Sequence, residues 1–409
     1  MGRTSHRNRE SRNRGQDKTA APVMVIDTPE ALDAFCKRLS KERFVTVDTE
    51  FMRERTFWPR LCLIQMAGAN EAAVIDPLAE GMDLAPFFEL MADESVLKVF
   101  HAGRQDIEII HHLAGIIPRP LFDTQVAAMV CGFGDQVGYE ALVNRLAGAR
   151  IDKGARFTDW SRRPLSEQQL RYALSDVTHL RVIFERLCEM LETSGREPWL
   201  KEEMDLLTDP ETYAQRPEDA WKRVKFRPRD ARQLAAMQRL AAWREEEAQR
   251  RDLPRRRILK DEALVELATQ MPETKEDLAR LRLFPEGLVN NPAAERILAV
   301  IREVRALPEE KLPAMPERRK APPEGANARA DVLKLALKIV CERENLAPRL
   351  VASAADIEAL AAGRRDLPLL RGWRRQVFGD LALKLLEGKR VIGLRNGKPD
   401  IFPAPSGAH

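Results

Sequence analysis

The sequence predicts an α/β domain followed by two all-helical domains. The first part, up to about residue 205, begins with short β-branched and apolar runs typical of strands and then alternates strands with helices. From residue 229 onward, apolar residues recur at helical spacing in two blocks, separated by a stretch rich in proline, glutamate and lysine. A chain of 409 residues is long enough for two or three such domains.

Short apolar runs predict the strands of the first domain. Three such segments come first, and a helix, a strand, another helix and a last short strand follow before the chain becomes helical. The strands are expected at about 44–48, 60–66, 72–76, 96–100 and 121–123. Ser166 and Gln169 form a capping-box pattern, which opens a long helix with an apolar stripe.

Two carboxylates lie at the end of the first long strand. Asp48 and Glu50 are separated by one residue, so their side chains point to the same face of the strand. Neighbouring acids repel each other unless a cation lies between them, and hard divalent cations prefer oxygen ligands. Taken alone, however, the pair fits a solvent-exposed strand end better, since surface acids are common.

Two further acids occupy comparable places. Asp106 follows the strand at 96–100 and lies near the first turn of a helix, where the helix dipole alone would favour a carboxylate. Asp176 comes four residues after Tyr172 on the long helix, so these two side chains share one face. In isolation, this pair is explained better by a packed ring whose hydroxyl is hydrogen-bonded.

Together, the stretches around 45–51, 101–106 and 172–176 resemble the three motifs of the DEDD family of 3′–5′ exonucleases, in the subclass whose third motif contains tyrosine. The histidine subclass would have histidine one position before Tyr172, where this chain has Arg171. The flanking sequence is similar to the ribonuclease D family over about residues 24–310. The matching motifs lie at 48–51, 60–66, 75–77, 122–125, 158–160 and 163–165.

This resemblance implies a ribonuclease H-like exonuclease fold and a nuclease active site. Two divalent cations, Mg²⁺ or Mn²⁺, would assist phosphodiester hydrolysis. Four acids would hold them: Asp48, Glu50, Asp106 and Asp176. Tyr172 would orient the attacking water as a neutral phenol, because an unperturbed phenol is protonated at neutral pH. The implied activity removes nucleoside 5′-monophosphates from the 3′ end of RNA, with tRNA precursors and other small structured RNAs as partners.

The resemblance also implies residues that contact the last nucleotides. Thr49, Phe51 and His101 are expected to line the pocket for the terminal nucleotide. Because Phe51 alternates away from Glu50 along a strand, its contact with a base requires the strand to end or bend there. Three cations near the third motif are expected to contact phosphates: Lys153, Arg156 and Arg163.

The region after residue 228 resembles the helicase-and-RNase-D C-terminal (HRDC) domain, most clearly at 243–254, 261–264 and 278–281. A basic run in this region could bind phosphates, although a charged, solvated helix end explains it equally well. The run contains Arg255, Arg256, Arg257 and Lys260. A second helical unit follows, which is identified by its position and helical pattern and not by a sharp motif.

These patterns divide the chain into seven segments, of which the exonuclease domain is expected to hold a core of its own. The segments are a disordered basic tail (1–22), the exonuclease domain (23–205), a connector (206–228), a first HRDC domain (229–307), a linker (308–326), a second HRDC-like domain (327–386) and a C-terminal tail rich in glycine and proline (387–409).

Composition agrees with this division and argues against several other classes. A net charge of +4 and a pI of about 8.8 mean that any nucleic-acid-binding surface is local. The chain has no apolar run of transmembrane length and begins without an apolar signal core. The five cysteines form no paired motif. We therefore expect a reduced, cytoplasmic protein, and nothing in the sequence implies a membrane or an obligate protein partner.

Two other functions stay open. The same four acids serve 3′–5′ DNA exonucleases, and the HRDC-like region together with the stretch at 158–160 favours a ribonuclease over that alternative. The other hypothesis is a non-catalytic RNA-binding scaffold with an inactive exonuclease fold. The presence of every metal-binding acid argues against it.

Overall fold

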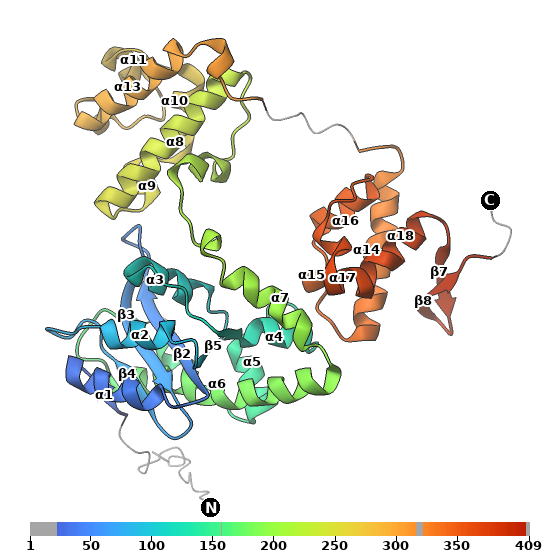
Figure 1. Cartoon of the computed structure of the whole chain (residues 1–409). Helices are drawn as coiled ribbons and strands as arrows, with labels where there is room; N and C mark the ends of the chain where they lie inside the picture. The colour runs from blue at the N-terminus through green and yellow to red at the C-terminus, as the bar shows by residue number, and fades with distance from the viewer. Residues whose placement is uncertain (1–22, 157, 316–321, 406–409) are drawn as a thin grey trace, which may run out of the picture.

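The computed structural model describes residues 23–156, 158–315 and 322–405 of the chain (Figure 1). The basic tail expected at 1–22 lies outside these residues. The predicted order of an α/β domain and then two helical units is confirmed. Within the described ranges, none of the helices has the length and apolar character needed to cross a bilayer.

A six-stranded mixed sheet forms the centre of the N-terminal domain. Its strand order is β1-β4-β3-β2-β5-β6, with β2–β3 and β3–β4 antiparallel and the other neighbours parallel. The strands are β1 (Val25–Ile26), β2 (Phe44–Met52), β3 (Arg60–Ala67), β4 (Ala72–Ile75), β5 (Leu97–Phe100) and β6 (Leu121–Asp123). All five expected strands are present. The two-residue β1 was missed because it is too short to show alternation.

The pairing of β2 with β3 changes register next to the two acids. Asp48 lies opposite Gln65 and Glu50 opposite Leu63, but Phe51 lies opposite Leu61. One residue of β3 is therefore left without a partner on β2, which is the pattern of a β-bulge and bends the strand. The extra residue is Cys62, so the irregularity lies in β3 and not in the strand that carries Phe51.

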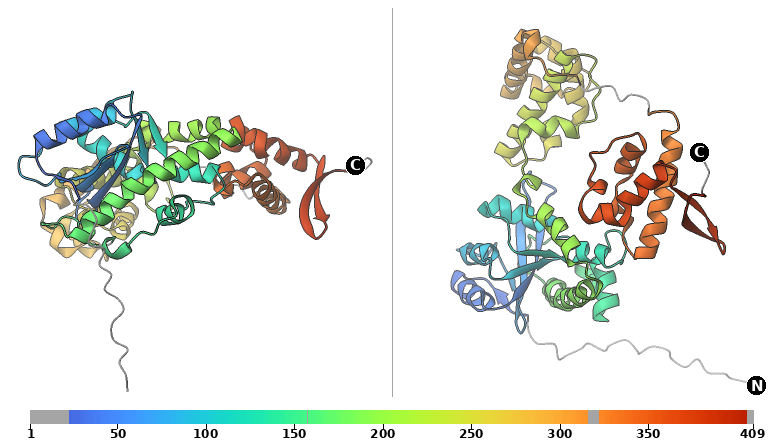
Figure 2. Two further views of the ribbon diagram at one scale, coloured as in Figure 1. Left: turned by 90° about the horizontal axis from the view of Figure 1, so that it is seen from below. Right: turned by 45° about the vertical axis from the view of Figure 1, so that its right-hand side comes forward.

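The long helix α6 (Glu167–Ser194) closes one face of the sheet. It begins at the expected capping box, in which the backbone N–H of Ser166 donates to Gln169 Oε1 at 3.0 Å. The hydroxyl of Thr46 on β2 donates to the carbonyl of Val177 on α6 at 2.9 Å. The sheet lies between α6 and α1 (Figure 2). The other helices of this domain are α1 (Pro29–Leu39), α2 (Ala85–Ala92), α3 (Arg104–Ala114), α4 (Thr124–Val130), α5 (Tyr139–Leu142) and α7 (Glu197–Leu207).

The first helical unit packs around its own apolar core, but the loop between β2 and β3 enters that core. Phe57 from this loop is buried among residues of the unit. The Oδ1 atom of Asp252 accepts hydrogen bonds from the backbone N–H groups of Phe57 and Trp58, each at 3.0 Å. The helices are α8 (Ala231–Arg251), α9 (Arg255–Ile258), α10 (Asp261–Gln270), α11 (Lys275–Arg280), α12 (Glu286–Val289) and α13 (Pro292–Ala306).

The second helical unit shares one continuous apolar core with the exonuclease domain. Trp199 of α7 stacks on Trp373 at 4.8 Å between ring centroids, and Asn345 donates to the carbonyl of Cys131 at 3.4 Å. The exonuclease domain has the core that was expected of it, and this core extends into the second helical unit at α4 and α7. The helices are α14 (Ala326–Glu344), α15 (Pro348–Val351), α16 (Ala354–Ala361), α17 (Gly372–Arg374) and α18 (Asp380–Leu386).

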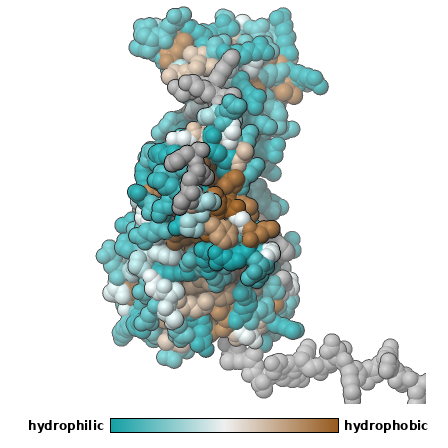
Figure 3. Space-filling view, turned by 90° about the vertical axis from the view of Figure 1, so that its right-hand side faces the viewer, coloured by the Kyte–Doolittle hydropathy of each residue, from teal (hydrophilic) through white to brown (hydrophobic). Residues whose placement is uncertain are grey.

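The C-terminal segment differs from the expected tail. Strands β7 (Arg390–Arg395) and β8 (Lys398–Pro403) form an antiparallel hairpin. Asn396 and Gly397 both have positive φ, which is the requirement of a two-residue type I′ turn. The glycine and proline content had indicated a tail, whereas the Asn-Gly pair between apolar residues was the stronger hairpin signal. Leu394 of β7 is 74% exposed, and Figure 3 shows apolar side chains gathered on this side of an otherwise hydrophilic molecule.

Candidate active site

Three carboxylates from two elements meet beside the sheet. Asp48 and Glu50 project from the same face of β2, and Asp176 comes from α6, which covers that face. One possible ligand oxygen from each of the three lies within 4.8 Å of the others. Strand alternation and the packing of α6 on β2 thus place acids that are far apart in the sequence in a single cluster, which we call the acid cluster.

Asp106 lies next to this cluster and is held by Thr49. It occupies the first turn of α3, as expected, and is 6% exposed. Its carboxylate accepts a hydrogen bond from the hydroxyl of Thr49, which is equally buried. Thr49 was expected to line the nucleotide pocket through the family resemblance. Its hydroxyl is committed to Asp106, so this side chain orients an acid and does not face a substrate.

Crowding raises the pKa of every acid in the group. Burial is the main cause, and it raises the pKa of Glu50 to about 8, that of Asp176 to about 7 and that of Asp106 to about 6. Burial and the charges of the other three acids raise the pKa of Asp48 well above its usual value. Without a cation, the cluster therefore retains protons that isolated carboxylates would release near neutral pH.

The donor set fits a hard divalent cation. All the side chains are carboxylates, and Mg²⁺ and Mn²⁺ are held mainly by carboxylates and other oxygen ligands. The raised pKa values agree with this assignment, because a bound cation would favour the ionised carboxylates that burial now disfavours. Asp48, Glu50 and Asp176 could hold such an ion directly, and Asp106 is adjacent to them.

A cavity of 290 Å³ opens beside the acid cluster. Its walls include Asp48, Asp176 and Tyr172, together with His101, Tyr139 and Arg156. Tyr172 lies one turn before Asp176 on α6, and burial is the main reason that the pKa of this phenol lies above its usual value. Tyr172 is therefore a neutral hydrogen-bonding group at the mouth of the acid cluster.

Tyr139 is a site residue that the sequence did not reveal. Its hydroxyl donates to the backbone carbonyls of Asp176 at 2.6 Å and Ser175 at 3.1 Å, so it anchors the turn of α6 that carries an acid. Burial raises the pKa of this phenol far above its usual value, and it stays protonated. No motif distinguished Tyr139 from an ordinary core tyrosine, because its role depends on a tertiary contact.

His101 lines the cavity as expected, and Thr124 holds its ring. The hydroxyl of Thr124 donates to the carbonyl of Phe100, and the same oxygen lies 3.0 Å from His101 Nδ1. This contact fixes the orientation of the imidazole ring in the cavity wall. Burial lowers the pKa of His101, so the ring is neutral at pH 7. Asp123 fixes the turn after His101 by accepting from the backbone N–H of Gly103 at 2.9 Å.

The cations that were expected to contact phosphates have different roles in the structure. Arg163 forms two 2.6 Å contacts with Asp76 and donates to the carbonyl of Cys62 at 2.7 Å. Its guanidinium therefore fastens the 158–164 segment to the sheet and is not retained as a phosphate ligand. Arg156 lines the cavity, and its charge lowers the pKa of Glu50. The side chain of Lys153 lies outside what the structure describes.

Phe51, the remaining member of the expected nucleotide pocket, is half-buried and packs against the main apolar core. It directly follows the register change between β2 and β3. Its expected contact with the terminal nucleotide stays a prediction. Its packing gives it a structural role whether or not that contact forms.

The basic run of the first helical unit contains one arginine with a structural role and three exposed cations. Arg255 forms two 2.5 Å contacts with the fully buried Glu245 and lies 4.4 Å over the ring of Phe57. It links the helical unit to the β2–β3 loop and is not available for RNA. Arg256, Arg257 and Lys260 are exposed.

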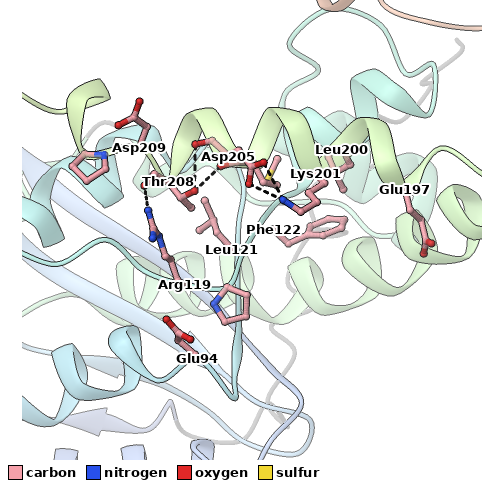
Figure 4. A pocket seen from close by; sticks show the side chains of 13 residues that line it. Glu94, Arg119, Leu121, Phe122, Glu197, Leu200, Lys201, Asp205, Thr208 and Asp209 are labelled. Atoms are coloured by element: carbon pink, nitrogen blue, oxygen red, sulfur yellow. Dashed lines mark hydrogen bonds and ion pairs between the residues drawn. The ribbon is translucent and has the colours of Figure 1, made fainter. Parts of the chain in front are cut away.

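A larger cavity of 830 Å³ lies away from the acids, between α7 and β6 (Figure 4). Its charged groups largely satisfy one another or the backbone. Lys201 pairs with Asp205 at 3.0 Å, and Arg119 donates to the carbonyl of Thr208 at 2.6 Å. No set of polar groups among its described residues converges on one point, so the smaller cavity beside the acid cluster is the candidate active site.

Comparison with known proteins places this site in a family. The 3′–5′ exonuclease family matches residues 23–192, and the HRDC domain family matches residues 233–301. The chain is 48% identical over 382 residues to ribonuclease D of Gluconacetobacter diazotrophicus, covering 93% of this chain and 97% of that protein. It is 49% identical over 375 residues to ribonuclease D of Nitrobacter hamburgensis, covering 91% and 98%.

A solved structure agrees with these sequence relatives. The crystal structure of Escherichia coli RNase D, described as an exoribonuclease involved in structured RNA processing, matches with a TM-score of 0.79 and 32% identity. The match covers 90% of this chain and 99% of that one. It therefore includes the helical units as well as the exonuclease domain.

Proposed function

The chain belongs to the ribonuclease D family and is a 3′–5′ exoribonuclease, and from this premise we propose that it hydrolyses RNA with two divalent cations and releases nucleoside 5′-monophosphates. The observation that carries the proposal is the acid cluster with Tyr172 at one cavity. An all-oxygen cluster beside a cavity of limited volume suits the removal of one nucleotide at a time.

The four acids hold the cations in this proposal. Asp48, Glu50 and Asp176 offer oxygens that are already close together, and Asp106 completes the set from α3. When bound, divalent cations lower the pKa of water and stabilise the negative charge that develops on the phosphate and the leaving oxygen. The choice between Mg²⁺ and Mn²⁺ is left to experiment, since both accept this donor set.

Tyr172 positions the attacking water. It lines the cavity with Asp176, and its high pKa keeps the proton on the phenol. It therefore acts as a directed hydrogen-bonding group and not as a bulk base. Tyr139 holds the backbone of the same helical turn, so the two tyrosines act on Asp176 through its side chain and its carbonyl respectively.

The neutral His101 and the cationic Arg156 are suited to the substrate. Both line the cavity with Asp48. Arg156 supplies positive charge opposite the phosphate, and His101 supplies a polar ring whose orientation Thr124 fixes. A pocket that accepts one terminal nucleotide beside the acids requires a free 3′ end, so circular RNA and RNA with a 3′-phosphate should resist attack.

We assign tRNA precursors and other small structured RNAs as the substrate class. The related E. coli enzyme is described as acting in structured RNA processing, and this chain carries the same helical units beyond its exonuclease domain. Exposed cations on the first unit, Arg256, Arg257 and Lys260, could contact the body of such an RNA while its 3′ end lies in the cavity.

The test is hydrolysis of a tRNA precursor labelled near its 3′ terminus, compared with single-stranded DNA of the same sequence. Each substrate is incubated with the purified chain in Mg²⁺, in Mn²⁺ and in EDTA. Mononucleotide release from RNA that depends on metal is expected. Faster release from DNA would support the DNA exonuclease alternative, and binding of RNA without hydrolysis in either metal would support a scaffold.

A further inference from the structure

Gln65 is a buried amide whose hydrogen bonds are not made by any described residue. It lies in the middle of β3 and is 0% exposed. Both Nε2 and Oε1 are shielded from solvent and lack a partner among the described side chains and backbone groups. A buried amide without partners is unfavourable, because it has lost its hydrogen bonds to water without replacing them. An apolar side chain would occupy this position without that cost.

The strand register shows where the amide lies. Gln65 pairs directly with Asp48 across the antiparallel β2–β3 ladder. Directly opposed residues point to the same face of a sheet, with Cβ atoms about 4.5–5.5 Å apart. Gln65 therefore shares the face that carries Asp48 and Glu50, and it is within side-chain reach of the first of these acids.

The same face is closed by α6. Thr46, two residues before Asp48 on β2, donates its hydroxyl to the backbone of α6, and Asp176 enters the acid cluster from that helix. The Gln65 amide thus lies in an enclosed space bounded by the sheet, α6 and the acid cluster. The polar side chain directly opposite it in the sheet is Asp48 of the acid cluster.

We propose that Gln65 is a positioning residue for Asp48, whose carboxylate it orients toward a bound divalent cation by donating a hydrogen bond from Nε2. This inference rests on the proposed function, since it takes Asp48 as a metal ligand. Asp48 has two carboxylate oxygens, and a donor on one of them fixes the direction in which the other is presented. Groups that orient metal ligands in this way typically change metal affinity or activity by about 10- to 100-fold when removed.

The variant Gln65→Met tests the proposal, because methionine keeps the length of the side chain and removes the amide. Mn²⁺ binding to the metal-free full-length protein is measured by calorimetry, and the unfolding temperature is measured in EDTA. Mn²⁺ affinity should fall by about 10- to 100-fold. The unfolding temperature in EDTA should stay the same or rise, because an unpaired buried amide has been removed.

Gln233→Met is the matched control. Gln233 is also buried, at 8% exposed, but its Oε1 accepts from the backbone N–H of Arg229 at 3.0 Å in the first helical unit. Its replacement should lower the unfolding temperature and leave Mn²⁺ affinity unchanged. If Gln65→Met behaves like this control, Gln65 is a structural residue and the proposal is overturned.

Combining Gln65→Met with Asp48→Asn distinguishes failure of the proposed function from failure of the proposed role of Gln65. In the Asp48→Asn background, Gln65→Met should have no additional effect on any remaining Mn²⁺ binding. An equal loss of affinity in both backgrounds would mean that Gln65 acts on another group. If Asp48→Asn alone leaves Mn²⁺ affinity unchanged, the metal assignment of the proposed function fails. If Asp48→Asn lowers Mn²⁺ affinity and Gln65→Met does not, the proposed function is supported and the proposed role of Gln65 is wrong.

Discussion

Tyr172 and Asp176 lie one turn apart on α6; burial raises the pKa of Asp176, and the hydroxyl of Tyr172 partly offsets that rise. This arrangement joins the group that would position water to one of the groups that would hold metal. Replacing Tyr172 with Phe deletes the hydroxyl and keeps the ring. The single-turnover rate of RNA hydrolysis should fall by roughly 10²–10⁴-fold, while Mn²⁺ affinity should stay within about tenfold of the native value. Equal single-turnover rates for the two proteins would show that Tyr172 only packs.

Asp48→Asn should abolish hydrolysis without weakening the fold. The pKa of Asp48 is raised by burial and by three neighbouring acids, so its ionised form is disfavoured in the metal-free protein and a neutral amide of the same shape should be tolerated. The unfolding temperature in EDTA should be unchanged or higher, and RNA binding should persist. Asp33→Asn is the control, because Asp33 lies on α1, is partly exposed and pairs with Lys37 on the same helix. Measurable turnover by Asp48→Asn in saturating Mg²⁺ would contradict the assignment.

Stabilisation by Mg²⁺ should increase with pH. In the metal-free fold the pKa values of Asp106, Asp176 and Glu50 are about 6, 7 and 8, above the ordinary values of 3.8 and 4.5. The folded state thus binds more protons than the unfolded state, and the stability that these protons contribute is present at low pH and lost as pH rises toward 8. Because Mg²⁺ must displace the same protons to bind, its stabilisation of the fold is weakest at low pH.

The measurement is the shift in unfolding temperature between EDTA and Mg²⁺ at pH 6, 7 and 8. Other titrating groups affect both samples equally, so the difference isolates the acid cluster. A shift that grows from pH 6 to pH 8 is expected for the native chain, and Asp48→Asn should flatten this trend. A constant shift across this range would argue that the acids are already ionised without metal.

Gly132→Ala should disrupt the docking of the second helical unit. Gly132 has φ of +82°, and a Cβ there would lie 2.3 Å from side-chain atoms of Asn345 and 2.4 Å from its carbonyl oxygen. Gly134→Ala provides a close control, since Gly134 also has a positive φ, of +99°, but has open space around the Cβ position. Both variants should lose stability through backbone strain, about 1–2 kcal/mol. Only Gly132→Ala should additionally increase proteolysis of the second unit.

Replacing Arg255 should lower stability, whereas replacing its neighbouring cations should weaken RNA binding. Arg255→Gln removes one of the cations that neutralise the buried Glu245, and a loss of about 1–3 kcal/mol in unfolding free energy is expected. Joint replacement of Arg256, Arg257 and Lys260 by Gln should leave stability unchanged. The log–log salt slope of tRNA binding should fall by roughly 0.7–0.9 for each phosphate that the variant no longer neutralises. Identical slopes for the native and triple-variant proteins would show that this surface does not touch RNA.

Local patterns in the sequence were sufficient to predict the strands, the long capped helix and the spacing of the acids. These features depend on alternation along a strand and on side chains one helical turn apart, which short stretches of sequence record directly. The roles of Arg163 and Arg255 could not be predicted in this way. A cation looks the same in sequence whether it faces solvent or a carboxylate brought to it by the fold, and here Asp76 and Glu245 are those partners.

Contacts between domains were the other feature that sequence did not reveal. Trp373 is buried against Trp199, yet a single tryptophan in a helical pattern gives no indication of which domain it faces. Gln65 illustrates the same difficulty within one domain. Its position in an apolar strand is typical of a buried residue. A role for its amide can be proposed only from the strand register, which places it opposite Asp48.

The shared apolar core has a consequence for the way in which the protein is made. Arg374 of the second helical unit pairs with Glu203 of α7 across 171 positions in the chain. During synthesis on the ribosome, the catalytic half emerges long before the segment that completes its packing. Domains generally fold as units from the N-terminus during translation. In this chain, the apolar surface of α7 that Trp373 covers stays exposed until the second helical unit has emerged and packed against it.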